Sequence, residues 1–233
     1  MPKKITTLFC FSPAVMLATF LVETVACIYA LIRWGEGLFG GLAVFLLLSL
    51  GIFQWSEYII CKGGDPFLWA KIGHVAITWL PVIGLQLVSM ATYRTRFVRL
   101  AWGCGAFLSF GIIVSQGIFV AAVCTGRYVI FETQSFFDWT YGVYYLSLLC
   151  IALGMLFAAL WQKKGDRTLL QWMMFGYLSF LVPTCTLSLL AMHVRGGVPS
   201  IMCGFALVMA LTVVVCILPR YKAVISRQRK SKR

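Results

Sequence analysis

Charged residues are scarce in this sequence. Asp, Glu, Lys and Arg make up 12% of its 233 residues, while 61% of the residues are hydrophobic. A typical soluble domain has about 25% charged residues. The long uncharged runs therefore place the chain in a membrane, where about 20 residues per span would allow about seven helices. Little is left for a soluble domain, so we expect any soluble output domain to belong to a partner.

Motifs of enzymes and metal sites are also absent. The sequence has no HExxH, GxSxG or GxGD motif and no Cys/His spacing typical of a metal site. Its two histidines are far apart in the chain, and the last apolar run lacks the lysine that a retinal protein would need. We therefore expect a protein that is not an enzyme and that holds no metal or cofactor.

The apolar runs predict an all-α membrane protein, a bundle of seven transmembrane helices. Residues 1–218 would form the transmembrane domain, and residues 219–233 a basic tail too short to fold alone. The longest loop, 124–138, is rich in Phe and Tyr, so we expect it to fold over the bundle or to lie in the membrane interface. The predicted spans are 8–32, 38–60, 67–92, 100–123, 139–161, 168–192 and 201–218.

Basic residues outnumber acidic residues by 20 to 7, which gives a net charge of +13. Because they gather in loops and in the tail, we expect them to set the orientation rather than to bind nucleic acid. The positive-inside rule predicts an outer N-terminus and a cytoplasmic C-terminus. The tail is most simply a topology anchor, and it could also bind anionic lipid or an acidic partner. Its cluster consists of Arg227, Arg229, Lys230, Lys232 and Arg233.

A polar group surrounds the loop CKGGDP. Glu57, Lys71 and His74 lie inside apolar segments, where an ionisable residue usually has a partner or a function. They could line an outward-facing pocket for a small anion, a polar ligand or a lipid headgroup, with Trp69 and Tyr144 as further ligand-binding candidates. The simpler interpretation is a Glu57–Lys71 ion pair that staples two helices. His74 is then a hydrogen-bonded histidine between helices, and a pH switch is the alternative.

One glutamate and two cysteines also lie within the predicted spans or at their ends. We interpret Glu23, inside the first span, as a protonated or hydrogen-bonded structural residue, since no chain of acidic residues crosses the membrane. Cys61 and Cys124 both fall at predicted outer ends of spans, where an oxidising compartment would permit a disulfide. The sequence leaves open whether these two cysteines approach within bonding distance.

Several motifs carry a resemblance to a known family. They are Glu57 at the end of the second span, FLWAKIGHVAITWLP in the third, WTYGVYYLSLL in the fifth, LLQWMMFGYLSFLVP in the sixth, and the exit ILPRYKAV. With these motifs the chain resembles the seven-transmembrane N-terminal sensor region of bacterial histidine kinases. In that family the region precedes a cytoplasmic output domain, whereas this sequence stops at Arg233. The resemblance therefore implies the fold, a location in a bacterial inner membrane, and a sensor-like role without an output domain of its own.

These observations together favour a non-enzymatic, sensor-like or partner-binding membrane module. Membrane lipid and a protein partner, in the membrane or the cytoplasm, are its expected contacts. Two alternatives remain open. The chain could be an accessory structural subunit of a larger membrane complex, or a small seven-helix transporter that uses Pro81 and Pro183 as hinges.

Overall fold

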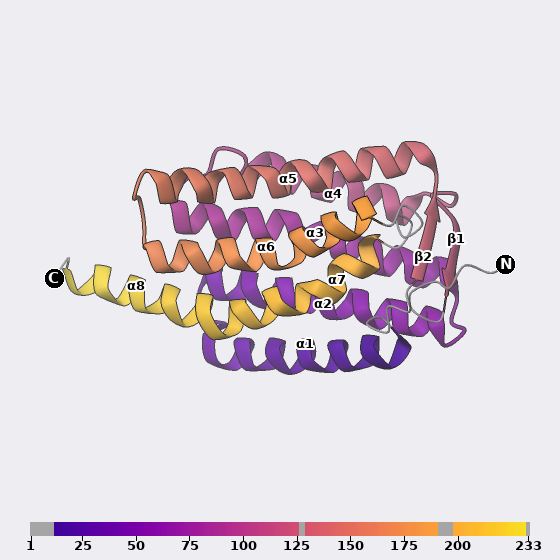
Figure 1. Ribbon diagram of the computed structural model, residues 1–233, viewed down its shortest axis with the longest axis horizontal. Helices are drawn as coiled ribbons and strands as arrows, with labels where there is room; N and C mark the ends of the chain where they lie inside the picture. Colours follow the sequence, from indigo (N-terminus) through magenta and orange to yellow (C-terminus); the bar gives the residue numbers. More distant parts are fainter. Residues whose placement is uncertain (1–11, 126–128, 191–197, 232–233) are drawn as a thin grey trace.

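Long apolar helices that run back and forth make up most of the structure (Figure 1). The computed structural model describes residues 12–125, 129–190 and 198–231. A two-stranded antiparallel hairpin, β1 (Phe119–Cys124) and β2 (Val129–Thr133), lies at one end of the bundle. The helical elements are α1 (Pro13–Trp34), α2 (Leu38–Cys61), α3 (Pro66–Thr92), α4 (Val98–Val114), α5 (Ser135–Trp161), α6 (Arg167–Leu190), α7 (Val198–Thr212), the π-helical η3 (Val213–Ile217) and α8 (Leu218–Ser231).

Among the described residues, five helices are long and apolar enough to cross a membrane. They are α1, α2, α3, α5 and the continuous segment Gly204–Arg227, while α4 is apolar but has 17 residues. Their outer surfaces carry large apolar side chains, such as Ile32, which is 81% exposed, and Phe107, which is 76% exposed. Such faces would be costly in water and are compatible with contact to lipid tails. The structure is that of an integral membrane protein, as the composition predicts.

Two tryptophans mark the ends of the lipid-facing side of α5. Trp139 is 76% exposed and Trp161 is 78% exposed. At about 1.5 Å per residue, the helix between them is roughly 33 Å long. This matches the roughly 30 Å of a bilayer's hydrocarbon core, and Trp is enriched at its two interfaces. One membrane surface therefore lies near the hairpin end of the bundle and the other near α8.

The turn between α2 and α3 forms as its sequence predicts. Gly63 has a φ of 90°, which favours glycine. Asp65 caps α3, since its Oδ1 accepts hydrogen bonds from the amides of Phe67 at 2.9 Å and Leu68 at 3.2 Å. Pro66 occupies the first helical position, where its missing N–H costs nothing. This turn leads into α3, the central helix, which packs against α2, α4, α5 and β1.

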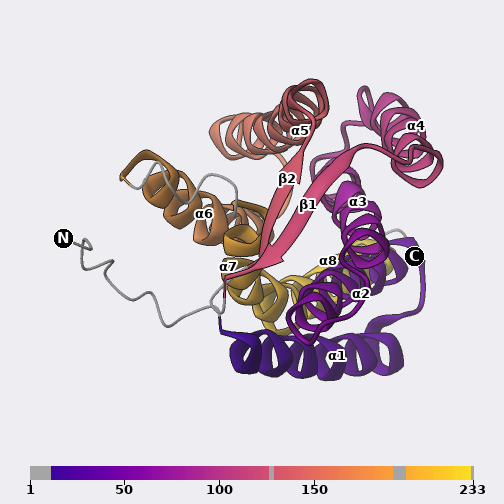
Figure 2. The same cartoon turned by 90° about the vertical axis from the view of Figure 1, so that its right-hand side faces the viewer.

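The prediction of a fourth helical span over 100–123 is wrong in its second half, and the chain is therefore not entirely helical. Helix α4 ends at Val114, Ser115 is extended, and β1 begins at Phe119. The residues of the two strands are largely β-branched, aromatic or small, and they pair across the end of the bundle (Figure 2). The hairpin packs on α2 and α3, which agrees with the expectation that this loop folds over the bundle.

The basic tail is helical and continues the last span without a break. In η3 the amide of Leu218 donates to the carbonyl of Val213, a hydrogen bond one residue longer than in an α-helix. This wide turn directly precedes Pro219, whose ring has no N–H to donate to the preceding turn. Helix α8 then extends past the other helices (Figure 1). The predicted domain boundary at 218 therefore falls inside a continuous helix.

Candidate functional site

His74 lies on α3 directly beneath the hairpin. Its ring centroid is 4.7 Å from those of Phe119 on β1 and Phe131 on β2. Phe53 of α2 and Tyr141 of α5 follow at 6.4 Å and 6.0 Å. These four rings, from four elements, leave His74 only 3% exposed. His74 therefore fastens the hairpin to the bundle instead of facing an open pocket.

Hydrogen bonds extend this cluster along α3 and across to α5. The Nδ1 of His74 lies 3.0 Å from the carbonyl oxygen of Ala70. Since a carbonyl can only accept, Nδ1 carries the hydrogen. The hydroxyl of Thr78 donates to the carbonyl of His74 at 2.6 Å, and the hydroxyl of Tyr144 donates to the carbonyl of Thr78 at 2.8 Å. Tyr144 thus joins α5 to α3, and its hydroxyl hydrogen is already used in this bond.

The ion pair expected between Glu57 and Lys71 is absent, since the described residues show no such contact. Instead, the Nζ of Lys71 reaches the carbonyl of Ile113 on α4, at 3.5 Å. Glu57 is 1% exposed and lies near α1, on the other side of the hairpin turn. Trp69 is partly buried against the core and lies beside Gly64. The five candidate ligand residues therefore do not come together as one site.

Two buried carboxyl groups lie near each other on the α1 side of the bundle. Glu23 is 0% exposed and near enough to Glu57 to interact with it electrostatically. Neither carboxyl oxygen of Glu23 has a hydrogen-bond partner among the described residues. The hydrogen-bonded interpretation therefore has no support among the described residues, and an unpaired buried carboxylate would be very costly. Sequence reasoning missed this neighbour of Glu57, since nothing in the spacing relates the two glutamates.

A disulfide joins Cys61 to Cys124, with their Cα atoms 5.1 Å apart. It links the last residue of α2 to the last residue of β1. The bond therefore holds the hairpin over His74 from a second side. Structural disulfides persist in oxidising compartments, which bears on the orientation proposed below.

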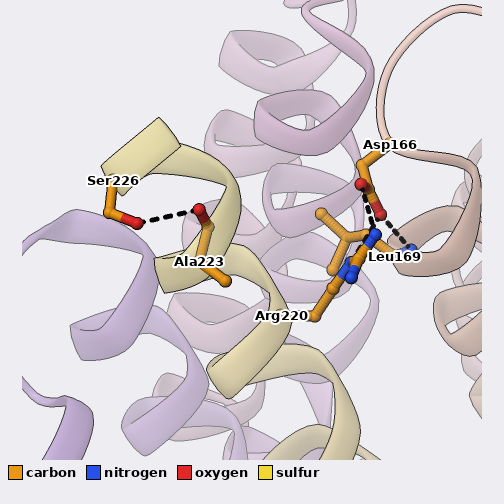
Figure 3. Close-up of polar contacts among 5 residues, drawn as sticks. All are labelled: Asp166, Leu169, Arg220, Ala223 and Ser226. Carbon is orange, nitrogen blue, oxygen red and sulfur yellow. Dashed lines mark hydrogen bonds and ion pairs between the residues drawn. The ribbon is translucent and has the colours of Figure 1, made fainter. Parts of the chain in front are cut away.

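At the opposite end of the bundle, Asp166 connects α6 to α8 (Figure 3). Its Oδ1 accepts hydrogen bonds from the Leu169 amide and the Arg220 Nε, both at 2.9 Å, and its Oδ2 accepts from Arg220 Nη2 at 2.8 Å. The hydrogen bonds from Arg220, ahead of that from Leu169, hold the pKa of the Asp166 carboxyl below its ordinary value. One carboxylate therefore caps α6 and anchors α8.

Sequence reasoning missed this ion pair. Asp166 carries a local signal, an acidic residue just before a helical run, which is typical of an N-cap. Its partner is 54 residues away, and no pattern in the sequence indicates that distance.

The predicted tail cluster is described in part. Arg227 lies on α8 and is exposed. Arg229 and Lys230 fall within α8, but their side chains lie outside the described part of the structure, and Lys232 and Arg233 lie outside the described residues altogether.

No protein-family model and no curated protein matches this sequence. The function of the chain therefore has to be inferred from its own residues.

Proposed function

We propose that the chain is a non-enzymatic membrane sensor or partner-binding module, and that α8 makes the contact with its protein partner. The observation that carries this proposal is the unbroken helix from α7 through η3 into α8. It leads from the apolar bundle to a basic segment beyond it (Figure 1). A helix of this kind moves with the bundle to which it belongs, so a change in packing reaches its exposed end.

The proposed topology has seven spans, α1 to α7, with the hairpin outside and α8 in the cytoplasm. The disulfide at the hairpin end supports an oxidising compartment on that side, such as a bacterial periplasm. Basic residues at the other end, among them Arg94, Lys163 and Arg227, support a cytoplasmic location by the positive-inside rule. Together with the resemblance to the sensor region of bacterial histidine kinases, these observations lead us to propose a bacterial inner membrane.

A route from the hairpin to α8 exists through packed elements. The disulfide and the aromatic cluster around His74 join the hairpin to α2 and α3. Helix α3 in turn contacts α6, and Asp166 at the start of α6 holds Arg220 of α8. A ligand or force that acts on the hairpin therefore has a continuous route of direct contacts to α8. This chain of contacts favours a sensor over a purely structural subunit.

Transport is supported less well. The cavity next to Pro81 and Tyr177 has a volume of about 30 Å³. That is about the volume of one water molecule in the liquid, so a transported solute would find no room there.

A photo-crosslinking amino acid at Arg227 tests the proposal in intact membranes. The matched control carries the same group at Phe107, which is exposed on the lipid-facing side of α4. We expect position 227 to give one protein adduct of defined mass, and position 107 to give lipid adducts. The partner is then identified by mass spectrometry, and the complex is rebuilt from the two purified proteins. Lipid adducts alone at position 227 would contradict partner binding through α8.

A second arm separates the sensor from the accessory subunit. The crosslink yield at position 227 is measured before and after reduction of the Cys61–Cys124 disulfide. If the hairpin is the input, loosening it should change the yield. An accessory structural subunit should give the same yield under both conditions.

A further inference from the structure

A groove of about 660 Å³ lies at the α8 end of the bundle, between the α1–α2 turn and α8. One wall is aromatic, since the ring of Phe39 stacks on that of Tyr221 with centroids 3.7 Å apart. Trp34 closes the groove towards α1, and Lys222 and Ser226 line it from α8. The groove therefore combines apolar rings with a cation at the level where α5 places a membrane surface.

Lys222 lines this groove, and a second cation, Arg33, lies beside the lining residue Trp34 without lining the groove itself. The Nζ of Lys222 lies 5.2 Å from the centroid of the Trp34 ring, and the Cζ of Arg33 lies 5.3 Å from it. Both cations are thus held beside the same indole. Glu36 also lines the groove and is its opposing charge. With Arg33 beside Trp34 added to Lys222, two cations near the groove face one carboxylate, and this balance favours an anionic ligand.

Hydrogen-bond donors face the same space. Helix α2 begins at Leu38 after Gly37, whose φ of 84° suits glycine, and no side chain caps its first turn. Leu38, Phe39 and Gly40 line the groove, so their uncapped amides are available to an acceptor. Donors at an uncapped helix start normally find an acceptor.

The apolar surface beside the groove indicates where that acceptor comes from. Leu38 lines the groove and is 64% exposed, and Leu31 and Ile32, in the last turn of α1 before Trp34, are 59% and 81% exposed. We propose that the groove binds the headgroup of an anionic phospholipid, with the phosphate near Lys222 and the α2 amides. The acyl chains lie along the exposed side of α1. This site is distinct from the basic tail cluster and does not depend on the partner proposed above.

Native mass spectrometry of the purified full chain in mild detergent tests the site. The protein is incubated with phosphatidylglycerol or with phosphatidylcholine of the same acyl chains, and retained lipid is counted. We expect one phosphatidylglycerol to be retained in preference to phosphatidylcholine. Lys222→Gln should weaken its retention about five-fold, the usual effect of one basic residue near a membrane surface. Lys222→Arg should restore it, and Glu36→Gln should strengthen it.

The control is Lys164→Gln, a change of the same charge on the exposed α5–α6 loop, which should leave retention unchanged. Thermal unfolding of each variant checks that the fold is intact. Inorganic phosphate should not compete at the lipid's concentration, because it cannot use the apolar surface of α1. Equal retention of the two lipids would overturn the proposal. An equal loss of phosphatidylglycerol in Lys222→Gln and Lys164→Gln, or effective competition by phosphate, would also overturn it. A lipid-free dimer in the same spectra would do so too, since a second copy would then fill the groove.

Discussion

Arg220 and Asp166 form an ion pair with two hydrogen bonds, of 2.9 Å and 2.8 Å, across 54 residues of the chain. This geometry is the strong form of a guanidinium–carboxylate contact. Because Asp166 also accepts a hydrogen bond from the amide of Leu169, the start of α6 and the start of α8 share one carboxylate. The position of α8 therefore depends on the ionisation of Asp166.

Acid should release α8. Hydrogen bonds from Arg220 lower the pKa of Asp166 from its ordinary value of 3.8. The stabilisation is therefore fully present above that value and is lost as the pH falls through the lowered pKa. We expect amide hydrogen exchange in residues 218–227 to accelerate below about pH 4, after correction for intrinsic rates. Asp166→Asn should give the faster exchange at every pH, and Asp138→Asn at the hairpin end should behave like the wild type.

Loss of the disulfide should destabilise the bundle. Replacing Cys61 or Cys124 by Ser removes a crosslink between residues 63 apart. We expect a cost of about 2–4 kcal/mol, because the unfolded chain gains freedom. Thermal unfolding in detergent measures it, and reductant should give the same shift in the wild type. The matched control is Cys150→Ser, a free and exposed cysteine. An equal effect there would contradict a specific role for the disulfide.

The packing around His74 should matter more than its charge. His74→Ala leaves a cavity among four rings, which should cost about 3 kcal/mol. His74→Phe keeps a ring in place and loses the hydrogen bond to Ala70, worth about 1 kcal/mol. Thermal unfolding of both variants provides the comparison. A Phe variant as unstable as the Ala variant would show that the polar atoms of His74, and not its volume, hold the hairpin.

Gly84 and Tyr177 should be energetically coupled. A Cβ at Gly84 would collide with the hydroxyl oxygen of Tyr177, so Gly84→Ala should cost about 1–3 kcal/mol. That hydroxyl is buried and has no hydrogen-bond partner among the described residues, so Tyr177→Phe should be neutral or stabilising. In the double variant Phe should recover most of the loss. A double-mutant cycle that gives simple additivity would contradict this contact.

Glu23 should be better tolerated as an apolar residue. Its buried carboxyl lies near Glu57 and has no hydrogen-bond partner in the described part of the chain. Glu23→Met should therefore raise stability by about 1 kcal/mol or more. Glu132→Met, at an exposed position of β2, is the control and should change stability little. A stable Glu23→Met protein that no longer crosslinks to its partner would show that Glu23 is kept for function.

Local chemistry could be predicted from the sequence with good accuracy. The α2–α3 turn is fixed by the backbone preferences of Gly63 and Pro66 and by Asp65, whose side chain accepts from the amide two residues further on. The end of α4 could not be predicted in this way. The apolar run from Gly117 to Cys124 fits both the end of a helix and a short buried strand. The choice is made by packing against α3 and by pairing with β2, which lie elsewhere in the chain.

Long-range contacts account for most of what was missed at the candidate site. The spacing of Glu57 and Lys71 from their loop predicts a similar depth for both. It does not give the direction in which each side chain points around its helix. Lys71 turns towards α4 and Glu57 towards α1. The four rings around His74 and the partner of Asp166 likewise come from elements that no local pattern relates.

The π-helical turn of η3 sets the angular phase of everything that follows it. A π turn holds one residue more than an α turn, and one residue corresponds to a rotation of about 100° and a rise of about 1.5 Å along the axis. If η3 shortened to an α turn, α8 would rotate by that angle relative to α7. Arg220 would then leave Asp166, and Lys222 would leave Trp34. The single extra residue thus fixes the rotation of α8 about its axis, and this rotation aligns both of these contacts with the bundle.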